Sequence, residues 1–138
     1  MAATLTLYAP EEYIRATIKQ RAAICNGCGP TGKWKFRLIS DMLFGLCIKE
    51  ACDIHDWMYA FGRTEKDREE ADRVFRNNML RIVDWSGGWR PIIFLRRRKA
   101  QHYYALVRNF GAIYFWADKN AELNEYVVEV DNDMISRI

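Results

Sequence analysis

The sequence predicts a mainly α-helical domain with two antiparallel helices at its centre. Apolar residues recur at helical spacing in successive segments, and glycines and prolines are concentrated between those segments. The chain has 138 residues and is 50% hydrophobic, which is enough to bury one core without dividing. We therefore expect residues 1–138 to form a single domain.

The first expected helix covers residues 11–24. Glu11 and Glu12 suit a helix N-terminus because their charges complement the helix dipole. Residues 25–32, with three glycines and a proline, favour a sharply turned loop with accessible carbonyls. Residues 33–44 alternate only in part, so a short strand and an irregular segment both remain open.

Two further helices are expected on either side of Gly62. The pattern from Leu46 to Phe61 keeps helical spacing, and Gly62 suits a helix C-terminus. Thr64, with Asp67 three residues later, is typical of a helix start, and the apolar pattern continues to Val83. The short connection predicts that these helices run antiparallel.

After a turn at residues 85–91, the pattern predicts a fourth helix over about residues 93–116. Residues 126–130 fit either an edge strand or a loosely attached tail. No stretch approaches the roughly 20 apolar residues of a membrane-spanning helix. The segment from Met1 to Pro10 lacks the pattern of a secretory signal.

The formal charge of +3 is unevenly distributed along the chain. The segment after Asp118 is mostly acidic. A basic cluster suits phosphate groups, so anionic membranes and nucleic acids are both admissible partners. The clustered cations are Arg90, Arg96, Arg97, Arg98, Lys99 and Arg108.

The cysteines fall in one short region, at Cys25, Cys28, Cys47 and Cys52. Such a grouping indicates two disulfides or a metal site, for which His55 is a further candidate ligand. Zinc is disfavoured because two cysteines five residues apart on a helix diverge by about 140°. Paired cysteines would indicate an oxidising compartment.

His55 and Asp56 are adjacent on the second expected helix, so their side chains leave it about 100° apart and need separate roles. Asp72 lies near the middle of the third helix, and the turn at Gly62 is about midway between Asp72 and His55. Antiparallel packing therefore brings Asp72 to the height of His55. Asp72 can orient one imidazole nitrogen while the other takes a proton from water. Tyr59, one turn after His55, can reach the same carboxylate.

Asp56 would then face the glycine-rich loop. Carboxylate oxygens, backbone carbonyls and water are the ligands that calcium prefers. The combination indicates metal-assisted ester hydrolysis, in which a neutral histidine activates water and the ion stabilises the developing oxyanion.

At these residues the sequence resembles the phospholipase A2 superfamily, in particular its bacterial and viral-type members. The pattern Cys52-x-x-His55-Asp56-x-x-Tyr59 resembles the active-site helix of the family, and Ala71-Asp72-x-x-Phe75 resembles its partner helix. The segment Gly27-Cys28-Gly29-Pro30-Thr31 is similar to its calcium loop. The resemblance covers roughly residues 24–80.

The resemblance implies a small phospholipase A2-like fold, stapled by disulfides. It also implies calcium-dependent hydrolysis of the sn-2 ester of glycerophospholipids to a free fatty acid and a lysophospholipid. The family pattern has glycine where this chain has Thr31, with Gly32 one place later. The resemblance implies a Cys28–Cys52 bridge, after which Cys25–Cys47 is expected as the second. The implied catalytic residues are His55, Asp72 and Tyr59, and the implied calcium ligands are Gly27, Gly29, Thr31 and Asp56.

The run Arg96, Arg97, Arg98 and Lys99 fits a solvated helix face, a nucleic-acid patch or a membrane-docking surface. An enzyme acting on lipids favours docking to a phospholipid membrane, with no nucleic acid as partner and an exported location. Two other functions remain open. One is a non-catalytic membrane- or protein-binding module, motivated by Thr31, and the other is a zinc-stabilised nucleic-acid binder.

Overall fold

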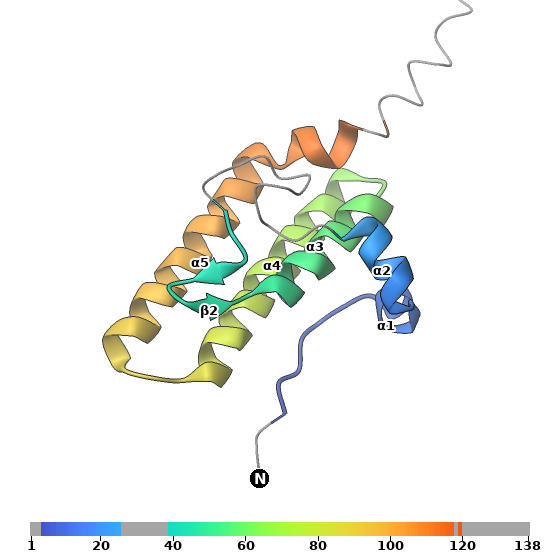
Figure 1. The fold of residues 1–138 in the computed structure, drawn as a ribbon. Coiled ribbons are helices and arrows are strands. Elements are labelled where there is room, and N and C mark those ends of the chain that lie inside the picture. Colours follow the sequence, from blue (N-terminus) through green and yellow to red (C-terminus); the bar gives the residue numbers. More distant parts are fainter. Residues whose placement is uncertain (1–3, 26–38, 118, 120–138) are drawn as a thin grey trace, which may run out of the picture.

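The computed structural model describes residues 4–25, 39–117 and 119. This part of the chain is mainly helical, as predicted, and carries a small antiparallel sheet (Figure 1). Residues 112–117 are also helical. The elements are α1 (Glu11–Arg15), α2 (Ile18–Ile24), β1 (Met42–Leu43), β2 (Leu46–Cys47), α3 (Lys49–Phe61), α4 (Glu65–Ser86) and α5 (Arg90–Phe110).

The expected first helix is split into α1 and α2. Ala16 and Thr17 have extended backbone, with ψ of 146° and 161°. The Thr17 hydroxyl accepts a hydrogen bond from the Gln20 backbone N–H at 3.1 Å, and the Gln20 side chain accepts one from the Thr17 N–H at 2.9 Å. This reciprocal cap starts a new helix within an apolar pattern that looks continuous.

The residues before α3 form a hairpin, so α3 begins at Lys49 and not at Leu46. Leu43 pairs with Leu46 across a two-residue turn made by Phe44 and Gly45, whose φ angles are 44° and 81°. Positive φ at both turn positions gives a backbone twist that matches the twist of paired strands. Glycine adopts this conformation readily, whereas Phe44 adopts it at some cost.

The central helices are arranged as predicted. Figure 1 shows α3 and α4 side by side in opposite directions, with α5 on the other side of α4. The cap expected at Thr64 is present, since its hydroxyl accepts from the Asp67 N–H at 3.1 Å. The buried core between these helices and the hairpin includes Leu43, Ile48, Ala51, Phe75, Met79, Val83, Ala100, Tyr103 and Phe115.

Helix α5 begins three residues earlier than expected, at Arg90, because Pro91 fits the first turn of a helix. The chain turns at Gly111 and continues as helix over residues 112–117, which brings Phe115 back to the α3–α4 connection. A Cβ atom on Gly62 would lie 2.6 Å from Cε2 of Phe115. Glycine at this position therefore allows the Phe115 ring to cover the turn.

The predicted Cys25–Cys47 bridge is wrong, because both residues are free thiols. Cys47 is exposed on β2, whereas the sulfur of half-buried Cys25 lies 3.1 Å from the carbonyl oxygen of Asp53 on α3. Cys52 is fully buried in α3. Its predicted partner Cys28 lies outside the described residues, so the Cys28–Cys52 bridge stays a prediction.

The segment before α1 is attached to α4 by a side-chain amide. Asn78 accepts a hydrogen bond from the Tyr8 backbone N–H and donates one to the Tyr8 carbonyl, both at 2.8 Å. Arg81 also donates to the Thr6 carbonyl at 3.1 Å. None of the helices in the described ranges has the length and apolarity needed to cross a membrane.

Candidate active site

The structure brings His55 and Asp72 together between α3 and α4. Nε2 of His55 lies 2.8 Å from Oδ1 of Asp72, and both side chains are buried. The helical periodicity and the short turn place both residues on facing sides of the two helices. The pairing expected from the sequence is therefore present in the fold.

Tyr59 binds the same carboxylate oxygen. Its hydroxyl donates to Oδ1 of Asp72 at 2.6 Å, from one turn further along α3 than His55. The rings of Tyr59 and Phe75 also lie 4.2 Å and 4.7 Å from the imidazole, measured between centroids. These two rings restrict how the imidazole can turn.

The other oxygen of Asp72 faces two arginines that the sequence analysis did not select. Nη1 of Arg108, on α5, lies 2.8 Å from Oδ2, and Nη1 of Arg68 lies 3.6 Å from it. Arg68 is four residues before Asp72 on the same helix, and this opposite-charge spacing is a local signal that could have identified it. Arg108 is 36 residues away, so no local spacing reveals its contact.

The contacts of Asp72 determine its protonation state. Burial by itself would raise the pKa of this carboxyl, but the hydrogen bond and charge of His55, with the bonds from Tyr59 and Arg108, lower it below its ordinary value. Burial and the charge of Asp72 raise the pKa of the Tyr59 hydroxyl, which therefore stays a donor. An ionised carboxylate only accepts hydrogen bonds. In its neutral form the imidazole would therefore carry its proton on Nε2, and Nδ1 is the nitrogen that would act as a base.

Asp56 is buried on α3, next to His55 but about 100° around the helix. Asp53 lies on the same side, about 60° from Asp56. Oδ2 of Asp53 accepts from Lys49 at 2.7 Å, whereas its buried Oδ1 has no hydrogen-bond partner among the described residues. Burial, followed by the charges of Asp53 and Asp56, raises the pKa of Cys25 to about 12.

This pair of carboxylates fits a hard cation. Carboxylate oxygens are calcium ligands, and the buried Oδ1 of Asp53 has no hydrogen-bond partner within the described part of the chain. Gly27, Gly29 and Thr31 lie outside the described residues. Within the described ranges, no group of three or more His, Cys, Asp and Glu side chains is arranged to hold a metal ion. A cation at Asp56 would therefore take other ligands from backbone carbonyls or water.

The four residues of the basic run on α5, Arg96 to Lys99, have different surroundings. Arg96 donates to the carbonyls of Leu43 and Phe44 at 3.2 Å and 2.9 Å, and Lys99 lies 4.5 Å from the centre of the Phe44 ring. Arg97 pairs with Asp84, and Arg98 is exposed. Two of the four residues predicted to contact a membrane thus hold the hairpin against α5.

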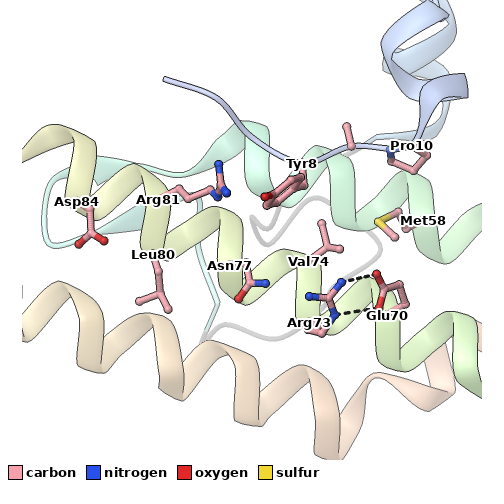
Figure 2. Close-up of a pocket in the computed structure, with 11 residues that line it drawn as sticks. Tyr8, Pro10, Met58, Glu70, Arg73, Val74, Asn77, Leu80, Arg81 and Asp84 are labelled. Carbon is pink, nitrogen blue, oxygen red and sulfur yellow. Dashed lines mark hydrogen bonds and ion pairs between the residues drawn. The ribbon is translucent and has the colours of Figure 1, made fainter. Parts of the chain in front are cut away.

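One of the grooves lined by described residues is separate from the His55–Asp72 pair. It has a volume of about 780 Å³ and lies between α4 and the segment before α1. Figure 2 shows Arg73 paired with Glu70 in this groove, and Arg81 lies 4.0 Å from the centre of the Tyr8 ring. Its arginines are already engaged within the protein, and its lining includes neither His55 nor Asp72.

No protein-family model, curated protein or solved structure matches this chain in the comparisons made.

Proposed function

We propose that this protein is a calcium-dependent phospholipase A2, which hydrolyses the sn-2 ester of glycerophospholipids to a free fatty acid and a lysophospholipid. The observation that carries the proposal is the buried hydrogen bond between His55 and Asp72, with Tyr59 on the same oxygen. A histidine oriented by a carboxylate is the general base needed to activate water. The lipid class and the sn-2 position come from the resemblance in sequence.

In the proposed mechanism, Nδ1 of His55 removes a proton from water as the water oxygen attacks the ester carbonyl. Asp72 stabilises the imidazolium that forms, because its carboxylate already accepts from Nε2. The imidazolium then returns the proton to the departing alcohol oxygen. Tyr59 and Arg108 hold the carboxylate during both transfers.

Asp56, with the carbonyls of Gly27, Gly29 and Thr31, would hold the calcium ion. An ion held there would supply positive charge to polarise the ester carbonyl and to bind the phosphate. The burial of Asp56 and Asp53 supports this assignment, since these two acidic residues lie within one turn of α3 in a low-dielectric environment.

The test is fatty-acid release from phospholipid vesicles. We expect release with calcium, its loss with a chelator, and a decrease of about 10²- to 10⁴-fold in His55→Gln. The chain offers a matched control in His102→Gln, because His102 is exposed on α5 and remote in sequence from the proposed site. Activity that persists in His55→Gln and in chelator would refute the proposed mechanism, provided that circular dichroism shows the variant folded.

A further inference from the structure

An exposed apolar and basic surface lies where α4 meets α5. Figure 1 shows this turn, in yellow, at one end of the two helices. Trp89 and Phe94 are 76% and 60% exposed, which is unusual for side chains of this size. We call the surface the α4–α5 patch. It consists of Trp85, Trp89, Arg90, Phe94, Leu95 and Arg98.

Three residues of the patch share one face of α5. Arg90, Phe94 and Arg98 follow one another at intervals of four residues, so their side chains form one stripe along the helix. Arg96 lies about 160° around the helix from Arg98 and binds the carbonyl of Phe44, so the hairpin tip contacts another side of α5. The patch therefore combines aromatic side chains with cations.

No acidic side chain in the described ranges neutralises the charge of the patch. Arg90 and Arg98 have no acidic partner in the described parts of the chain, whereas their neighbour Arg97 pairs with Asp84. Uncompensated arginines beside exposed tryptophan and phenylalanine match the boundary of a lipid bilayer. Aromatic rings are favoured at the depth of the headgroups, and cations are attracted to anionic lipids.

We propose that the α4–α5 patch docks the protein on an anionic membrane surface. Nucleic acid fits less well, because its binding rests mainly on neutralised phosphates, and the patch has two arginines beside four exposed apolar side chains. A second copy also fits less well, since a two-fold contact would bring like charges of Arg90 and Arg98 together. The patch shares Arg98 with the run Arg96–Lys99, whose predicted role in docking stays a prediction.

This docking rests on the proposed function, but it is measured as binding to vesicles, without hydrolysis of lipid. The full chain, in chelator, is sedimented with sucrose-loaded vesicles of phosphatidylcholine alone or with added phosphatidylserine. We expect more binding with phosphatidylserine. Trp89→Ser or Phe94→Ser should each weaken binding by about tenfold or more. Arg90→Gln and Arg98→Gln should each weaken it by about fivefold and reduce the preference for phosphatidylserine.

Two control variants carry the same kinds of change elsewhere. Ile18→Ser alters a side chain that is 86% exposed on α2, and Arg63→Gln alters an exposed cation in the α3–α4 turn. Both should bind vesicles like the wild type. Binding that is unchanged by the patch substitutions, or reduced equally by the controls, would overturn the proposal. So would patch variants that change only the oligomeric state or only retention on DNA.

The two proposals fail in different ways. In chelator, His55→Gln is expected to bind vesicles as the wild type does. The docking test therefore remains valid even if no hydrolysis is found. Conversely, hydrolysis of a soluble short-chain phospholipid by patch variants is expected at the wild-type rate. If those variants bind vesicles normally, the docking surface is refuted while the esterase proposal stands.

Discussion

Replacement of Arg108 by glutamine tests whether α5 holds the proposed catalytic carboxylate in place. The change removes a hydrogen bond of 2.8 Å between a guanidinium and a carboxylate that is fully buried. Breaking a buried charge pair costs about 3–5 kcal/mol. Asp72 keeps its bonds to His55 and Tyr59, and the Arg108 side chain is 25% exposed, so we expect a loss of about 2 kcal/mol in the free energy of unfolding.

The measurement is urea unfolding at neutral pH. Arg98→Gln is the matched control, because this exposed arginine lies on the same helix without an acidic partner in the described residues, and its loss should change stability by less than about 0.5 kcal/mol. Arg108→Lys keeps the charge but lacks the planar fork of donors. Its free energy of unfolding should therefore lie between those of the wild type and Arg108→Gln.

The pH dependence of this effect has a definite sign. The pKa of Asp72 is lowered in the folded protein, so its ionised form stabilises the fold above the ordinary carboxyl pKa, and this stability is lost as pH falls through the folded-state pKa. A protonated Asp72 carries no charge, so its interaction with Arg108 contributes less to the free energy of unfolding. The difference between wild type and Arg108→Gln should therefore shrink in acid. Equal stability of Arg108→Gln and Arg98→Gln at neutral pH would refute this account, as would a difference that stays constant into acid.

Two other substitutions test the packing around the site. Tyr59→Phe removes the donor at 2.6 Å from Asp72 and should lower the free energy of unfolding by about 1–2 kcal/mol, measured by urea unfolding. An unchanged midpoint would show that this bond contributes no net stability. Gly62→Ala would place a Cβ 2.6 Å from the Phe115 ring and should cost about 1–3 kcal/mol, measured as a lower melting temperature. The double variant Gly62→Ala with Phe115→Leu should lose less stability than the sum of the two single losses. Strictly additive losses would show that the Cβ does not clash with the Phe115 ring.

The pairing of His55 with Asp72 could be predicted because local signals determine it. Helical spacing sets which face each residue occupies, and the cap at Thr64 sets where α4 begins. A short turn then leaves antiparallel packing as the favoured arrangement. Each of these signals acts within a few residues, so their combination places two side chains 17 residues apart in contact.

The first half of the chain shows where such signals are ambiguous. The apolar pattern passes through Ala16 and Thr17, but the local cap at Thr17 competes with helix continuation and prevails. The hairpin strands have two residues each, so they are too short to show an alternation of apolar and polar residues. The positive φ of Phe44 is also contrary to its residue type, and tertiary contacts with Arg96 and Lys99 accompany it.

The basic residues of α5 show why charge clusters alone assign no role. In the sequence, Arg96 to Lys99 form one run, yet a helix turns successive side chains by about 100° and so directs neighbours to different surroundings. Arg96 reaches the hairpin, which precedes it by about 50 residues in the chain, while Arg98 faces outward. Arg108, three turns beyond, points inward to Asp72. Because these partners lie on other elements, the function of each arginine depends on how α5 packs, and substitution of single arginines separates roles that reversal of the whole run would confuse.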